Sequence, residues 1–127
     1  MSELVNCVLI VEDEFLIADM FEAQIEDMGI TVCGIADTAD KAVALAREHR
    51  PALVLMDVRL KGAKDGVDAA IAIHDTVASK IIFITGSREP ANVKRIQLDH
   101  PTAVLFKPIY GGALQRAVEA ALSLPMR

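Results

Sequence analysis

The stretch VLIVEDE (Val8–Glu14) decides the fold: four consecutive aliphatic residues are followed at once by three acids. A strand with one face in water alternates apolar and polar residues, whereas this run is apolar throughout, as in a parallel strand buried on both faces. We therefore expect a buried strand over Cys7–Val11 with a polar site at its carboxyl end.

Four further apolar runs have strand length: Thr31–Ala36, Ala52–Met56, Lys80–Thr85 and Ala103–Phe106. Between and after them, apolar residues recur at the spacing of an amphipathic helix. The residues that mark these helices are Ile17, Met20, Phe21, Ile25 and Met28; Val43, Ala46 and Arg47; Val67, Ala70, Ile71 and Val77; Val93 and Ile96; and Leu114, Ala117, Val118, Ala121 and Leu122. The alternation predicts a parallel α/β sheet covered by helices on both faces.

Residues that favour the start or the end of a helix stand at the expected helix boundaries. Gly29 is placed to stop the first helix, and Asp37 or Thr38 to cap the second. Asp65 caps the third, and Pro90 suits the first turn of the fourth. The five strand–helix units use nearly the whole sequence, so we expect one domain over residues 1–127 with no output domain.

Composition excludes several functions. The net charge is −5 and no cluster of Lys or Arg is present, which argues against nucleic-acid binding. No apolar run approaches the roughly 18 residues of a membrane span, and the amino terminus lacks a signal-peptide pattern. Cys7 and Cys33 have neither disulfide-scaffold nor zinc spacing and are expected to be buried thiols. We therefore expect a cytoplasmic protein that does not interact with a membrane.

Chemistry-bearing residues follow four of the five strands. The first strand is followed by Glu12 and Asp13, the third by Asp57, the fourth ends in Thr85, and the fifth is followed by Lys107. Because ligands of open α/β sheets bind beyond the carboxyl ends of the strands, these residues are candidates for one site. Crowded carboxylates repel one another, and Mg²⁺ relieves that repulsion. With the lysine, the set suits a phosphoryl group beside a metal ion.

Asp57 directly follows a buried strand, which presents its carboxylate rigidly. An aspartate can attack phosphorus itself and form an aspartyl phosphate. Each residue also has a structural interpretation, because acids at a helix start and an Asp or a Lys-Pro after a strand are common turn and cap features. The functional interpretation rests on all four groups falling at the ends of the strands.

The ordered motifs resemble those of the receiver domains of two-component response regulators. They are Val8–Glu14, Leu55-Met56-Asp57, Asp65-Gly66, Ile84-Thr85-Gly86 and Phe106-Lys107-Pro108. The resemblance implies a doubly wound, flavodoxin-like five-stranded parallel sheet in the order 2-1-3-4-5 with five helices. It also suggests a stand-alone, single-domain regulator.

The resemblance also implies the role of each site residue. Asp57 would be the phosphoacceptor, and Mg²⁺ would be held by Glu12, Asp13, Asp57 and the backbone carbonyl of Arg59. Thr85 would move toward the phosphoryl group, and Lys107 would pair with it. The donor would be a histidine kinase or a histidine phosphotransfer protein, and the phosphoryl group would be lost by autodephosphorylation.

Three departures from the family pattern bear on switching. Many receivers have proline where Lys61 stands and reach their Asp-Gly one residue sooner, so we expect a more flexible loop after Asp57. Val104 occupies the position of the usual switch aromatic, which leaves Phe106 or Tyr110 as substitutes, although Phe106 is better explained as a core residue. A motif of one alphaproteobacterial single-domain subgroup resembles Phe83–Gly86, but the aromatic that usually follows is missing in Ser87-Arg88.

The partner surface implied by the resemblance is the face of the fourth helix, fifth strand and fifth helix. It includes Asn92, Arg95, Tyr110 and Gln115, and the downstream target is unidentified. The protein would be a monomer or a phosphorylation-dependent dimer.

Two other functions remain open. One is a Mg²⁺-dependent phosphatase with Asp57 as nucleophile, although Arg59 stands where such enzymes often carry a second acid. The other is a scaffold that is never phosphorylated and so needs none of the site residues.

Overall fold

Five strands and five helices alternate along the chain in the computed structural model, which describes residues 5–86 and 88–123. Their bounds are β1 Val5–Val11, α1 Phe15–Asp27, β2 Thr31–Ala36, α2 Ala39–His49, β3 Pro51–Asp57, α3 Gly66–Thr76, β4 Lys80–Thr85, α4 Pro90–Leu98, β5 Ala103–Phe106 and α5 Ala113–Leu122. The predicted alternation is confirmed, and β1 and β3 are longer than predicted. In particular, Asp57 is the last residue of β3 and pairs with Ile84.

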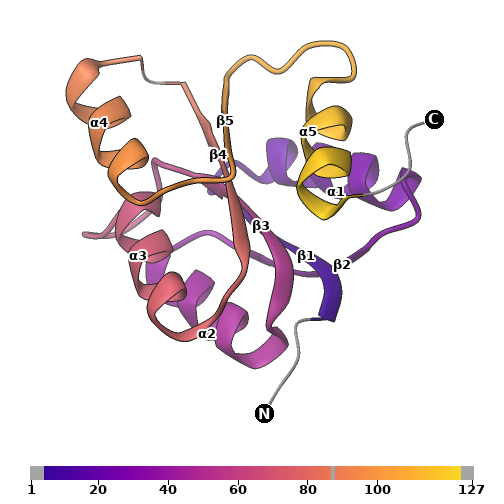
Figure 1. Cartoon of the computed structure of the whole chain (residues 1–127), viewed down its shortest axis with the longest axis horizontal. Helices are drawn as coiled ribbons and strands as arrows, with labels where there is room; N and C mark the ends of the chain where they lie inside the picture. Colours follow the sequence, from indigo (N-terminus) through magenta and orange to yellow (C-terminus); the bar gives the residue numbers. More distant parts are fainter. Residues whose placement is uncertain (1–4, 87, 124–127) are drawn as a thin grey trace.

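The strands form one parallel sheet in the order β2-β1-β3-β4-β5, as the resemblance implied (Figure 1). The register aligns their carboxyl ends. Val11 lies opposite Met56, and Thr85 lies opposite Phe106. The residues at or just beyond these ends therefore meet at one edge of the sheet, which is where a ligand site of this fold lies.

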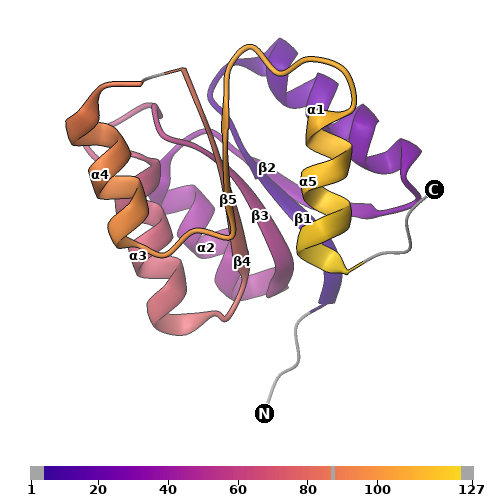
Figure 2. The same ribbon diagram turned by 45° about the horizontal axis from the view of Figure 1, so that its top comes forward.

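Both faces of the sheet are covered by helices. Helices α1 and α5 lie on one face, and α2, α3 and α4 lie on the other (Figures 1 and 2). Val8 and Ile10 pack on the α1–α5 side, whereas Leu9 and Val11 pack on the opposite side. Burial of both faces is why this strand is aliphatic without interruption.

The predicted helix ends are largely as observed. Thr38 caps α2 by accepting a hydrogen bond from the backbone of Lys41 at 3.1 Å. Asp65 caps α3 in a capping box with Asp68. Gly29 follows the end of α1 and has a φ of +78°. Few residues other than glycine adopt this backbone conformation, so glycine is suited to this position.

Two residues of the predicted apolar stripes lie in solvent. Met20 is 49% exposed and Ile71 is 50% exposed. The buried face of α1 is set by Phe21 and Ile25, and each helical residue turns about 100° from its neighbour, so Met20 points away from the sheet. In the described part of the chain, no helix has the length and apolar character needed to cross a membrane.

Candidate functional site

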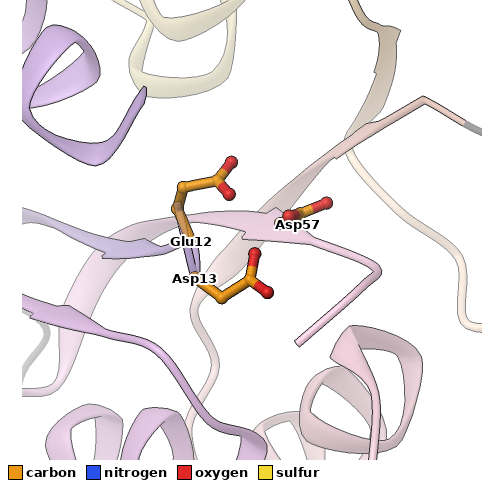
Figure 3. Close-up of side chains that lie close together, drawn as sticks. All are labelled: Glu12, Asp13 and Asp57. Atoms are coloured by element: carbon orange, nitrogen blue, oxygen red, sulfur yellow. The ribbon is translucent and has the colours of Figure 1, made fainter. Parts of the chain in front are cut away.

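Three carboxylates lie together at the ends of β1 and β3. One oxygen each of Glu12, Asp13 and Asp57 falls within 4.8 Å of the others, and Figure 3 shows the three side chains side by side. Glu12 and Asp57 are buried, whereas Asp13 is half-buried. The predicted acidic cluster is therefore assembled in space.

Lys107 joins this cluster from the end of β5. Its ammonium nitrogen lies 2.9 Å from Oε1 of Glu12 and 3.4 Å from Oδ2 of Asp57. Its backbone nitrogen donates to the carbonyl of Thr85 at 2.8 Å, which fixes the lysine beside β4. Burial alone would lower the pKa of Lys107, but the two carboxylates raise it, so the side chain remains a cation.

Asp57 carries the clearest electrostatic perturbation. Burial, and next the charge of Glu12, raise the pKa of Asp57 from 3.8 to about 7, although Lys107 acts in the opposite direction. In the metal-free protein this carboxyl group is therefore partly protonated at neutral pH. A divalent cation bound among the three oxygens would restore its charge. This all-oxygen donor set fits Mg²⁺, which binds one or two carboxylates and keeps several waters.

The cluster opens into a cavity of about 630 Å³. Its walls are formed by Asp13, Glu14, Asp57, Val58, Arg59, Thr85, Gly86, Arg88, Glu89, Asn92 and Lys107. This space is large enough for a phosphoryl group, a metal ion and its waters. All five predicted strand-end residues thus meet here, because Glu12, although not a wall residue, is bound to Lys107.

The loop after Asp57 is held by contacts within itself and with the segment before α2. The backbone nitrogen of Gly66 donates to the carbonyl of Val58 at 2.7 Å. Lys61 pairs with Thr38 in an isolated parallel bridge, and its ammonium lies 3.5 Å from Oδ2 of Asp37. The greater flexibility expected of this loop stays a prediction, and these contacts oppose it.

Arg95 connects α4 to the start of α3. Its guanidinium donates to both oxygens of Asp65, at 2.7 and 3.4 Å, and lies 3.5 Å from Oδ1 of Asp68. Burial would raise the pKa of Asp65, but hydrogen bonds from Arg95 and the Asp68 backbone lower it. The family resemblance implies only a partner-surface role for Arg95, whereas its guanidinium is paired with Asp65 and Asp68 within the molecule.

Removal of this contact is expected to loosen α4 from α3. Arg95→Ala should lower the free energy of unfolding by about 0.5 to 1 kcal/mol, since the ion pair is partly exposed. The pKa of Asp65 should rise toward its ordinary value, as measured by NMR titration of the carboxyl carbons. Lys94→Ala, on the adjacent exposed position, is the matched control. An unchanged Asp65 titration would show that the contact does not persist in solution.

The three residues of the predicted switch face differ in burial. Val104 is half-buried against the core on the α2–α4 side. Tyr110 is 75% exposed. Phe106 is half-buried, so its interpretation as a core residue is wrong in part: the guanidinium carbon of Arg88 lies 4.2 Å from the centre of its ring. Arg88 was not predicted as a site residue, although its place three residues after Thr85 was an available signal.

Comparison with known proteins identifies the family of this chain. Residues 8–119 match the family profile of the response regulator receiver domain. The chain is 33% identical over 122 residues to the phyllosphere-induced regulator PhyR of Methylorubrum extorquens, covering 95% of this chain and 45% of PhyR. It is 35% identical over 116 residues to the transcriptional regulatory protein PdtaR of Mycobacterium tuberculosis, covering 91% and 56%.

A similar crystal structure is that of the signal receiver domain of a modulated diguanylate cyclase from Desulfovibrio desulfuricans G20. It has a TM-score of 0.86 and 36% identity, with 95% of each chain covered. The chain therefore has the doubly wound α/β fold with a polar pocket at the carboxyl ends of its strands. It belongs to the receiver domains of two-component response regulators.

Members of this family are phosphorylated by histidine kinases and bind Mg²⁺ at an acidic pocket. The chain spans about half the length of the curated relatives that it matches.

Proposed function

We propose that Asp57 accepts a phosphoryl group from a phosphohistidine of a histidine kinase or a histidine phosphotransfer protein. The observation that carries this proposal is a buried carboxylate at the end of β3, between two acids and a lysine, on the wall of an open cavity. Phosphoryl transfer requires alignment and neutralisation of charge, and this arrangement supplies both.

In the transfer, an oxygen of Asp57 forms a bond to phosphorus as the phosphorus–nitrogen bond of the donor breaks. The imidazole leaves with the electron pair, and it leaves as a neutral group because its other ring nitrogen carries a proton. Lys107 exchanges its contacts with the carboxylates for the new phosphoryl oxygens, and the Thr85 hydroxyl turns toward the same oxygens. The phosphoryl group is lost when water attacks phosphorus, which releases inorganic phosphate and regenerates the Asp57 carboxylate.

Glu12, Asp13, Asp57 and the backbone carbonyl of Arg59 are the residues proposed to hold Mg²⁺. Bound there, the ion would supply positive charge that offsets the charge of the phosphoryl oxygens. Arg59 lies on the cavity wall, which is consistent with this role.

The donor protein is proposed to contact the start of α1. Phe15 is 75% exposed and Leu16 is 79% exposed, directly after the acids of the cluster. Two adjacent exposed apolar side chains next to the site are suited to contact with another protein. The modified domain is proposed to act in the cytoplasm by changing partner binding, as a stand-alone regulator that is a monomer or a phosphorylation-dependent dimer.

The test is intact mass measurement after incubation with Mg²⁺ and a small acyl phosphate. The wild-type protein should gain one phosphoryl group, and Asp57→Asn should gain none. Chelation of Mg²⁺ should slow uptake by at least about tenfold, because the ion supplies several kcal/mol of charge stabilisation. Asp75→Asn, exposed on α3 and outside the cavity, is the matched control and should behave as wild type.

Three outcomes would contradict the proposal. An adduct that persists in Asp57→Asn would place the nucleophile elsewhere. Sustained hydrolysis of a phosphate ester would favour the phosphatase function. Absence of an adduct in the wild-type protein with Mg²⁺ would favour the unphosphorylated scaffold.

A further inference from the structure

Arg88 lies between two features of the site. Its side chain forms part of the cavity wall that Asp57, Thr85 and Lys107 also line. Its guanidinium carbon also lies 4.2 Å from the centre of the Phe106 ring. Because Phe106 immediately precedes Lys107 and pairs in register with Thr85, this ring holds Arg88 beside the strand ends that form the site.

The charges of the site explain why Arg88 rests on a ring in the unmodified protein. The buried acid Glu12 is already paired with Lys107 at 2.9 Å, and the same ammonium lies 3.4 Å from Oδ2 of Asp57. An additional cation therefore gains little from these two acids. An exposed guanidinium on an aromatic face is held by a weak cation–π attraction.

A phosphoryl group on Asp57 changes this balance. It adds about two negative charges and three strong acceptor oxygens to the cavity. A guanidinium binds such oxygens through two parallel charge-assisted hydrogen bonds, which are stronger than a solvent-exposed cation–π contact. Glu14 and Glu89 on the same wall oppose the added charge, which increases the need for a cation there.

We propose that Arg88 binds the phosphoryl group, and that Phe106 holds its side chain until the group arrives. The inference rests on the proposed phosphorylation of Asp57. When Arg88 moves to the phosphoryl oxygens, it uncovers the Phe106 ring at the end of β5. This exchange changes the surface of β5 without an aromatic side chain at Val104.

The direct test follows the side chain of Arg88 by NMR. In the free protein its δ-methylene protons should be displaced upfield by the ring current of Phe106. Addition of Mg²⁺ with beryllium trifluoride, a mimic of the phosphoryl group, should return them to ordinary positions, whereas Mg²⁺ alone should not. Upfield signals that persist in the loaded protein would overturn the inference.

Substitutions test the same exchange through affinity for beryllium trifluoride. Arg88→Ala should weaken binding about tenfold, and Arg88→Lys should recover part of the loss because it keeps the charge without the bidentate geometry. Phe106→Leu should strengthen binding about twofold to fivefold, because the competing cation–π contact is lost. Arg116→Ala, at an exposed position of α5, is the charge-matched control.

The two substitutions are expected to change the affinity for beryllium trifluoride in opposite directions. If the contact between Arg88 and Phe106 were merely structural, both substitutions would weaken binding, or both would leave it unchanged. Either result would overturn the inference. The same samples are examined by intact mass with an acyl phosphate. If the wild-type protein takes no phosphoryl group, the proposed function fails and this inference with it. If Asp57 is modified but the Arg88 signals do not move, only this inference fails.

Discussion

A single methyl group added at Gly66 is expected to lower the free energy of unfolding by about 3 to 5 kcal/mol. The Cβ of an alanine there would collide with the backbone carbonyl oxygen of Asp57, lie 2.9 Å from its carbonyl carbon and 3.0 Å from the Cα of Val58. These are backbone atoms, which move only if β3 or the start of α3 shifts. The Gly66 amide is also bound to the Val58 carbonyl at 2.7 Å.

The sign of the effect distinguishes this cause from helix propensity. Gly66 is the first residue of α3, and propensity alone would favour alanine in the helix interior by up to about 1 kcal/mol. Urea unfolding followed by circular dichroism measures the change. Gly86→Ala is the control, because its Cβ meets nothing within 4 Å, and it should change stability by less than about 0.5 kcal/mol. Equal stability of the two variants would refute the collision.

The sheet and the acidic site were predictable because both follow from strand-level patterns. A strand buried on both faces has to be aliphatic throughout, as in Leu53–Met56. Parallel strands with aligned carboxyl ends bring together residues that are distant in sequence. Asp57 and Lys107 meet for this reason, although 50 residues separate them.

Long side chains with distant partners were not predictable in the same way. The partner of Arg95 is Asp65, 30 residues earlier, and that of Arg88 is a ring on another strand. No local period determines such pairs, because the direction of a flexible side chain depends on the packing of the helix that carries it. The environment of Phe106 is not predictable for the same reason, because its ring contacts the guanidinium of Arg88 from another segment of the chain.

In the metal-free protein, the Asp57 carboxyl group is expected to make the fold less stable as pH rises. Its pKa is about 7 in the folded protein, whereas the ordinary value of 3.8 applies in the unfolded chain. Between these values the folded protein retains a proton that the unfolded chain has released, so the free energy of unfolding falls as pH increases through this window. The contribution is fully present below pH 4 and lost above pH 7.

Asp57→Asn should abolish this dependence, because asparagine does not titrate. We expect the variant to be more stable than wild type by about 2 to 4 kcal/mol above pH 7, and nearly equal to it at pH 4. The upper limit corresponds to the full pKa shift, which already includes the effect of Lys107, and relaxation around the open cavity reduces the difference. Urea unfolding at pH 4 to 8 with a chelator gives the free energy of unfolding of each protein. The titration of the groups that the two proteins share cancels in the difference between these free energies.

Added Mg²⁺ provides the decisive comparison for the metal site. A cation that binds the three carboxylates stabilises wild type and lowers the pKa of Asp57, so the advantage of Asp57→Asn at pH 8 should shrink. The variant loses one charged ligand and should gain less from the ion. Parallel stability profiles with and without Mg²⁺ would mean that the carboxylates at the ends of β1 and β3 do not share a cation.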